Sequence, residues 1–162
     1  NWNPALRKPE LMSPDSYHWK EKKFAELTTR ELYDAMNLRQ EVFIVEQQAP
    51  YLDADNVDQV SIHLLAYCGE SLQGYARLVP PGVKYPEPSL GRIVLRQESR
   101  GTGFSRILVG KAIQKSKDLY PDLGIRISAQ HPLASFYRSF DFQEVGDVYD
   151  EDGIPHIEMF LV

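Results

Sequence analysis

The sequence contains little cysteine and no long apolar run. Cys68 is the single cysteine among 162 residues, so no disulfide can form within the chain. No stretch stays apolar over the about 18 residues that a membrane-spanning helix needs, and none has the pattern of a signal peptide. These features predict a reduced, cytoplasmic protein without a membrane partner.

Positive charge is also scarce. The chain has 18 lysines and arginines against 23 aspartates and glutamates, which gives a formal net charge of −5, and it has no basic run. A general nucleic-acid binder needs a dense basic face, because most of its affinity comes from phosphate contacts. We therefore expect no nucleic-acid partner. Small partners, cationic ones among them, suit this composition better.

The length predicts one domain. A chain of 162 residues buries about two thirds of its unfolded surface when it folds as a single unit. Residues 1–14 are rich in proline and show no hydrophobic periodicity, so we expect a flexible arm or residues foreign to the domain. The domain itself is expected to cover residues 15–162.

Hydrophobic periodicity predicts alternating strands and helices. Thr28 and Glu31 have the spacing of a capping box and open a predicted helix over about residues 32–44. A second helix begins after Gly103 and stops before Pro121, and a third, fairly long one starts near Leu133. The predicted strands cover residues 17–27, 61–68, 72–79, 91–95, 125–129, 143–149 and 154–161. This order indicates the α/β class, with a mixed sheet and helices on both faces.

Two loops lack periodicity. The prolines of residues 80–88 predict an exposed loop, because proline cannot join a strand ladder. Residues 46–60 are acidic, and Asp53-x-Asp55 resembles the start of a calcium loop, but Val57 stands where the next oxygen ligand belongs and the turn glycine is missing. No metal site is expected. The acidic loop either is solvated and caps the next strand or forms an acidic rim that faces a substrate.

Residues 91–105 run from a strand through a polar turn into a helix behind Gly101 and Gly103. Free N–H groups at a helix start bind anions, and glycines let a large ligand approach closely. A dinucleotide motif would need a third glycine where Arg106 stands, and a P-loop would need Gly-Lys-Ser/Thr. The stretch therefore predicts a phosphate-bearing ligand, although a plain tight turn also explains it.

The same stretch, followed by a second motif, resembles the GNAT superfamily of N-acetyltransferases. Arg100-x-x-Gly103-x-Ser105 resembles the acetyl-CoA motif of that family, and residues 133–142 resemble its second conserved motif. The family usually has glycine or alanine where Ser105 stands, a small residue that the loop should tolerate.

Further segments look like the ElaA-like branch of this superfamily. They are residues 38–47, the loop 51–55 and residues 148–156. One departure is Asp141, which stands where the family usually has glycine before phenylalanine. Aspartate tolerates a left-handed helix end better than most residues, so we expect the turn to be preserved.

The resemblance implies the acyl-CoA N-acyltransferase fold, with about seven strands and acetyl-CoA as the cosubstrate. Two parallel strands, ending at Leu95 and Ala129, would splay apart and hold the pantetheine arm between them. The acetyl group would pass directly to a primary amine of a small molecule or a protein. The residues assigned to CoA are Ile93, Val94, Leu95, Arg100, Gly101, Thr102, Gly103, Phe104, Ser105 and Arg106.

The resemblance and the expected strand order also suggest which residues act as general acid and general base. Tyr137 matches the family tyrosine beside the sulfur and is expected to be the general acid; the alternative is a core aromatic. His156 is the leading general base because histidine titrates nearest neutrality, with Glu151 or water as alternatives. Glu151, Asp152 and His156 would lie beside the acetyl group if the last two strands form a hairpin, the first of them parallel to the strand at residues 125–129, because its turn then lies at the carboxyl end of that strand.

Five residues are expected to contact the acceptor. Glu46 and Asp55 would bind a cationic group, His63 is a weaker candidate for the base, and Arg92 would orient a carboxylate or serve as a structural ion-pair partner. The residues expected at the acceptor site are Glu46, Tyr51, Asp55, His63 and Arg92.

Two other functions compete with catalysis. A non-catalytic acyl-CoA-binding or sensing domain could keep the same cofactor site, and a nucleotide-binding protein could use the same glycine loop. The acceptor itself cannot be deduced, because fold kinship does not transmit substrate choice. The oligomeric state is open, with a homodimer as a reasonable expectation.

Overall fold

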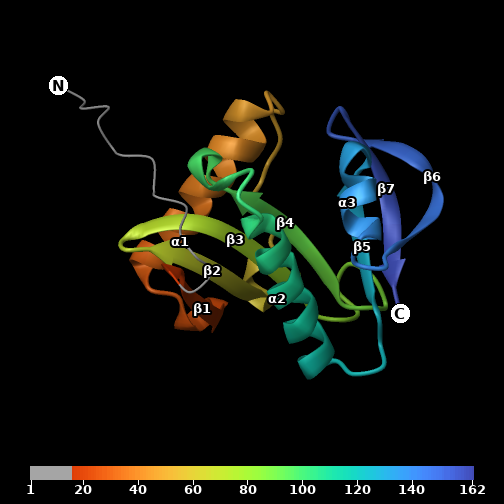
Figure 1. Cartoon of the computed structure of the whole chain (residues 1–162), viewed down its shortest axis with the longest axis horizontal. Coiled ribbons are helices and arrows are strands. Elements are labelled where there is room, and N and C mark those ends of the chain that lie inside the picture. Colours follow the sequence, from red (N-terminus) through yellow and green to blue (C-terminus); the bar gives the residue numbers. More distant parts are fainter. Residues whose placement is uncertain (1–15) are drawn as a thin grey trace.

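A seven-stranded mixed sheet organises the chain, as expected from the sequence (Figure 1). The computed structural model describes residues 16–162, so the predicted arm at residues 1–14 lies outside the described part. The strands, in sheet order, are β1 (His18–Lys23), β2 (Ile62–Cys68), β3 (Ser71–Val79), β4 (Ser89–Leu95), β5 (Ile125–Gln130), β7 (Ile154–Leu161) and β6 (Gln143–Glu151). The α-helices are α1 (Thr29–Arg39), α2 (Phe104–Leu119) and α3 (Ala134–Arg138).

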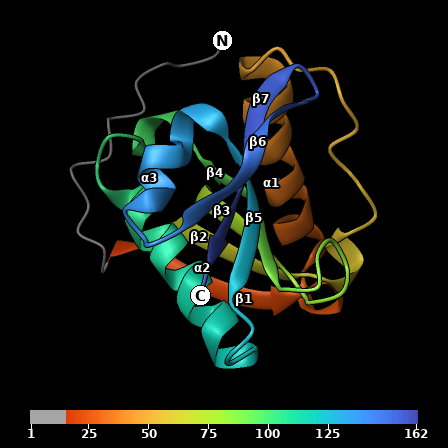
Figure 2. The same cartoon turned by 90° about the vertical axis from the view of Figure 1, so that its right-hand side faces the viewer.

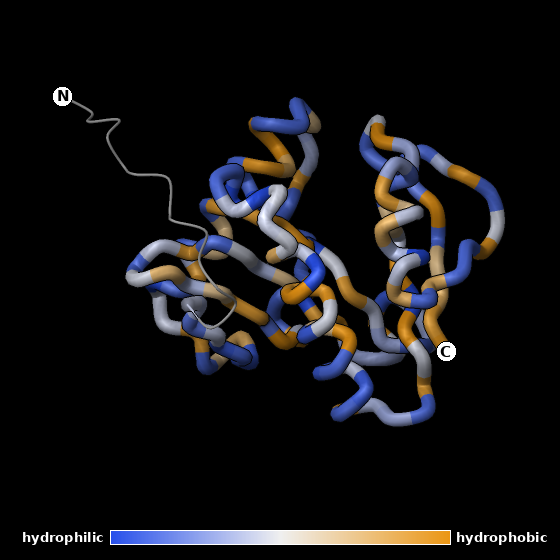
Figure 3. Tube along the Cα trace, viewed as in Figure 1, coloured by the Kyte–Doolittle hydropathy of each residue, from blue (hydrophilic) through white to orange (hydrophobic). Residues whose placement is uncertain are grey.

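Helices cover both faces of the sheet (Figure 2). One core lies under α1, where Leu38 and Phe43 pack against Leu65 and Tyr75. The other core lies under α2 and α3. The helices contribute Leu108, Val109, Ala112, Ala134 and Tyr137 to it. The trace is hydrophobic along the central strands and hydrophilic over most loops (Figure 3). Within residues 16–162 no helix has the length and apolar character to cross a membrane.

The sheet opens between β4 and β5, its parallel pair. In the described chain the two strands share one registered pair, Ser89 opposite Arg126, and diverge beyond it. Figure 1 shows the resulting separation of β5, β7, β6 and α3 from the rest of the sheet. The splayed strands that the family resemblance implied are therefore present.

A bulge in β4 lies beside this opening. Tyr75 is opposite Val94 and Arg77 is opposite Gly91, so two residues of β4 face one residue of β3. Arg92, in the bulge, has a φ of 49°, which is rare for a residue with a side chain. The bulge turns the Arg92 side chain toward the loop that follows α1, as described below.

The final hairpin reaches the carboxyl end of β5. β7 lies between β5 and β6 and runs antiparallel to β5, with Gln130 opposite His156. Asp152 and Gly153 form the turn with φ values of 53° and 80°, as two-residue hairpin turns require. β6 extends to Glu151, two residues beyond the predicted strand end, so Glu151 belongs to the strand and not to the turn.

The helix starts were predicted better than the helix lengths. The Thr28–Glu31 capping box is present and opens α1, which passes after Arg39 into a π-helical segment, Gln40–Glu46. The fairly long third helix is wrong: a 3₁₀ turn precedes α3, which has five residues. Asp141 stops it in a left-handed conformation with a φ of 71°, as expected for an aspartate at this turn.

Candidate active site

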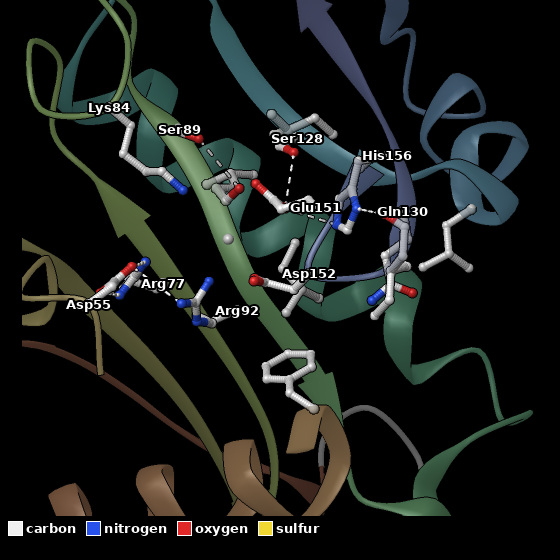
Figure 4. Close-up of a pocket in the computed structure, with 18 of the residues that line it drawn as sticks. Asp55, Arg77, Lys84, Ser89, Arg92, Ser128, Gln130, Glu151, Asp152 and His156 are labelled. Carbon is white, nitrogen blue, oxygen red and sulfur yellow. Dashed lines mark hydrogen bonds and ion pairs between the residues drawn. The ribbon is translucent and has the colours of Figure 1, made fainter. Parts of the chain in front are cut away.

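A pocket of about 340 Å³ lies where β4 and β5 diverge (Figure 4). Its walls come from the π-helical segment and the loop after it, from β3, β4 and the loop between them, from β5 and α3, and from the β6–β7 hairpin. The residues that line it include Tyr51, Asp55, Lys84, Arg92, Ser128, Tyr137, Glu151, Asp152 and His156. Segments far apart in the sequence therefore meet in one cavity, which is the usual form of a small-molecule site.

Tyr137 reaches the pocket from α3. The residue is 8% exposed, and none of the described residues forms a hydrogen bond with its hydroxyl group. Burial raises the pKa of Tyr137 to about 12. The hydroxyl group therefore keeps its proton at neutral pH and can donate it to a group bound in the pocket.

A chain of polar groups crosses the opposite part of the pocket. The Nδ1 atom of His156 donates to the Ile154 carbonyl group at 2.7 Å, and its Nε2 atom lies 3.0 Å from Glu151 Oε2. Since a carbonyl can only accept, Nδ1 is the donor in its bond to Ile154. Glu151 also accepts from Ser128 at 3.5 Å, and Ser128 is hydrogen-bonded to Tyr149.

The two members of the Glu151–His156 pair differ in exposure. Glu151 keeps 46% of its side chain exposed, whereas His156 keeps 10%. The exposed carboxylate can therefore meet an incoming amine while the imidazole holds it in place. His156, by contrast, has both ring nitrogens engaged.

Sequence reasoning missed Ser128 and Tyr149. Ser128 lies two residues before Gln130 and shares its face of β5, because side chains alternate along a strand. That alternation was the available signal for Ser128. Tyr149 is opposite His156 across the hairpin, a register that the sequence did not reveal.

Three arginines and three aspartates form a closed ring of ion pairs beside the pocket. Around the ring, Arg39 binds Asp53 at 2.8 Å and Asp58 at 2.7 Å, Arg77 binds Asp58 at 2.9 Å and Asp55 at 2.7 Å, and Arg92 binds Asp55 at 3.3 Å and Asp53 at 2.8 Å. The formal charges cancel. The ring clamps the loop after α1 onto β3 and β4.

The ring corrects the expectation of a solvated acidic loop. Asp53 and Asp58 are 6% and 3% exposed, so the expectation is wrong for both. Burial opposes the ionisation of Asp58, but Arg39 and Arg77 outweigh it and lower the pKa of Asp58 below its usual value. In the same way, Arg77 and Arg92 outweigh burial and lower the pKa of Asp55. These carboxylates stay charged and committed to arginine.

Of the five residues expected to contact the acceptor, three line the pocket and two lie outside it. Tyr51, Asp55 and Arg92 line the pocket, with the Arg92 guanidinium group 5.9 Å from the Tyr51 ring centre. Glu46 does not line it and forms a bidentate pair with Arg100 at 2.6 and 2.7 Å. Their roles toward an acceptor stay predictions.

His63 lies in the core and does not line the pocket. It is 1% exposed, its Nε2 atom donates to the Asp58 carbonyl group at 2.9 Å, and its Nδ1 atom accepts from the Tyr75 hydroxyl group at 2.7 Å. Burial lowers the pKa of His63. A neutral ring satisfies both contacts, so the geometry places His63 as support beneath the ion-pair ring.

The start of α2 has the features of an anion site. Gly101 and Gly103 have φ values of 73° and 81°, and a Cβ on either would project into open space. Gly103 is the N-cap residue and supplies no side-chain cap, while the Thr102 hydroxyl group is bound to the Ser99 carbonyl group at 2.8 Å. The N–H groups at this helix end are therefore available, and the residues present fit a phosphate group.

The two arginines at this loop are engaged with other protein groups. Arg100 donates to Glu46 and to the Leu95 carbonyl group. Arg106 donates to Ser139 at 2.8 Å and lies over the Phe140 ring, joining α2 to α3. Phosphate contacts from either side chain would compete with these bonds.

The residues of β4 and of the start of α2 that were assigned to CoA differ in whether their side chains can contact a ligand. Ile93 lines the pocket, whereas Val94 packs in the core under α1 and Phe104, at the start of α2, is 2% exposed. For Val94 and Phe104 only the backbone is left to meet a ligand. Beyond Ser89 the β5-facing edge of β4 has no registered partner within the described chain, so an extended ligand can pair with it.

Known proteins are similar to this chain in sequence. The family model of the acetyltransferase (GNAT) domain matches residues 25–162. UPF0039 protein sll0451 of Synechocystis is 45% identical over 145 residues, which cover 89% of this chain and 94% of that protein. Protein ElaA of Escherichia coli is 35% identical over 143 residues, which cover 87% and 94%.

Solved structures agree with these relatives. An acyl-CoA N-acyltransferase from Pseudomonas aeruginosa superposes with a TM-score of 0.87 and 38% identity, over 91% of this chain and all of that one (100%). The structure of Escherichia coli ElaA gives a TM-score of 0.85 and 33% identity, over 90% and 99%. Because the family model and the relatives cover most of its length, this chain belongs to the GNAT family of N-acetyltransferases, enzymes that take an acyl group from a CoA thioester.

Proposed function

We propose that the protein transfers an acetyl group from acetyl-CoA to a primary amine of a small molecule or a protein. The observation that carries the proposal is one pocket that holds a protonated tyrosine, Tyr137, and a carboxylate–imidazole pair, Glu151 and His156. Amide formation from a thioester needs one group that takes a proton from the amine and one that gives a proton to the sulfur. The pocket contains a candidate for each.

The cofactor would be held largely by backbone groups. The N–H groups of residues 101–105 would bind the pyrophosphate, and the free edge of β4 at residues 93–95 would pair with the pantetheine arm. The bound thioester supplies the activated acyl group. A backbone N–H group on the same edge would stabilise negative charge on its carbonyl oxygen.

The side chains would handle the protons. The amine nitrogen forms a bond to the acyl carbon while the carbon–sulfur bond breaks. Glu151, held by His156, takes the proton that the amine loses, and Tyr137 gives a proton to the departing sulfur. Glu151 then releases its proton to solvent and Tyr137 takes one back from solvent, so both groups return to their starting state and the step needs no oxidant or reductant.

Calorimetry and a thiol-release assay test the proposal. We expect the protein to bind acetyl-CoA and CoA in preference to NAD, and to release CoA thiol when it is given acetyl-CoA and a panel of amines. Binding of acetyl-CoA without thiol release from any amine would favour a sensing domain. A preference for NAD would overturn the assignment of the glycine loop to CoA.

A further inference from the structure

One lysine at the pocket is not committed to any carboxylate. Lys84 lines the pocket from the loop between β3 and β4, and its side chain extends toward β4 (Figure 4). Over residues 16–162, no carboxylate lies within ion-pair distance of its ammonium group. Arg77 and Arg92, on the same side, are already paired with aspartates of the ring. The pocket therefore has an available cation on this wall.

The loop that carries Lys84 is held in place. The Gly82 N–H group donates to the Tyr85 carbonyl group at 2.7 Å. Further along, Glu87 accepts two hydrogen bonds from Arg126, at 3.0 and 3.1 Å, and the Arg126 guanidinium group lies 5.9 Å from the Tyr85 ring centre. These contacts fix the loop to β5 and position the lysine at the pocket.

The opposite wall carries negative charge. Glu151 and Asp152 reach the pocket from the β6–β7 hairpin (Figure 4). Asp152 has no cation within ion-pair distance among the described residues, and Glu151 has only His156. The pocket is thus cationic at Lys84 and anionic at the hairpin.

The surroundings of Lys84 favour an anion. Although Lys84 is an exposed residue, desolvation and the charges of Arg77 and Arg92 lower its pKa, whereas the charges of Glu151 and Asp55 raise it. A bound carboxylate would relieve this repulsion. A purely cationic acceptor, such as a polyamine, would increase it.

We propose that the acceptor carries a carboxylate beside its amine, as a free amino acid does, with the carboxylate on Lys84 and the amine toward Glu151 and Asp152. The inference rests on the proposed function, because it names the substrate class of the same site. A charge-assisted hydrogen bond at Lys84 would select against analogues that lack the carboxylate.

Matched acceptors test the proposal. Free amino acids and their carboxamides have nearly the same shape, but only the acids carry the negative charge. We expect kcat/KM for acetyl transfer to be at least about tenfold higher for the preferred acid than for its carboxamide, mainly through KM. The carboxamide has the less basic amine, so chemical reactivity alone would favour it at neutral pH.

Two variants test whether Lys84 is the cause of the preference for acids over carboxamides. Lys84→Gln should reduce the acid-to-carboxamide ratio by about tenfold or more. Lys117→Gln, at an exposed lysine near the end of α2, makes the same change in charge away from the pocket and should leave the ratio unaltered.

The remaining outcomes distinguish failure of the amino-acid inference from failure of the proposed acetyltransferase activity. Equal use of acids and carboxamides, or equal ratios in the two variants, overturns the amino-acid inference while thiol release upholds the acetyltransferase. Absence of thiol release with every acceptor overturns both.

Discussion

Replacing Tyr137 by phenylalanine removes one hydroxyl group and nothing else. The ring packs edge-on against Phe136 and Phe142, with centroids 5.3 and 5.9 Å away, and phenylalanine keeps both contacts. None of the described residues is hydrogen-bonded to the hydroxyl group. We therefore expect the free energy of unfolding to change by no more than about 1 kcal/mol.

The effect on turnover should be far larger. A positioned general acid contributes roughly 100- to 10,000-fold to a rate, so Tyr137→Phe should lower kcat by that range. Since burial raises the pKa of Tyr137 to about 12, the wild-type hydroxyl group is protonated at every pH between about 6 and 9. The ratio of wild-type to variant kcat should therefore be constant over this range.

Thiol release at several pH values, with calorimetry of acetyl-CoA binding, measures both quantities. The matched control is Tyr120→Phe at the end of α2, which also removes a phenolic hydroxyl group but does not line the pocket. A loss in kcat of less than about threefold, or the same loss in the control, would refute the acid role. A ratio that changes tenfold across the pH range would show that another titrating group supplies the proton.

Three further variants test the remaining parts of the site. Glu151→Gln removes the carboxylate that faces the amine, so kcat should fall about 100-fold while calorimetry shows unchanged acetyl-CoA affinity; unchanged kcat would assign the base to water. Asp58→Ala leaves two buried arginines short of a carboxylate, so urea unfolding should show a free energy of unfolding lower by about 3–5 kcal/mol. The control Glu41→Gln, in an exposed pair, should lower it by less than about 1 kcal/mol. Because the folded-state pKa of Asp58 is lowered, its contribution is present above about pH 4 and is lost as the pH falls below it; stability independent of Asp58 at pH 7 would contradict this. Gly103→Ala, at a φ of 81°, should weaken acetyl-CoA binding in calorimetry, whereas Gly110→Ala inside α2 should not.

Much of the fold was predictable because it depends on neighbours in the chain. Thr28 and Glu31 are three residues apart, so their capping box could be deduced before any tertiary contact was known. The left-handed turn at Asp141 and the glycines that open α2 belong to the same class. The helix after residue 133 was predicted too long, because its apolar spacing runs on to Phe140, whereas α3 ends at Arg138, ahead of the left-handed turn at Asp141.

The candidate site was only partly predictable. Tyr137 was identified through the family resemblance, and Glu151 and His156 from the expected position of the final hairpin. The structure brings all three to one pocket. Lys84 was missed, because the surrounding prolines predict an exposed loop without indicating its direction. That direction depends on the contacts of Glu87 with Arg126, which lie 39 residues apart.

The order of strands and helices, the glycine-opened helix start and the family could all be predicted from the sequence alone. These features depend on periodicity, on backbone conformation and on motifs within short segments. Only the tertiary structure decided which charges are free. Asp53, Asp55 and Asp58 read as available acids along the chain, yet three arginines from α1, β3 and β4 neutralise them. Charge pairing depends on sheet register over long separations, so the unpaired lysine opposite the hairpin carboxylates appears only once the strands are placed.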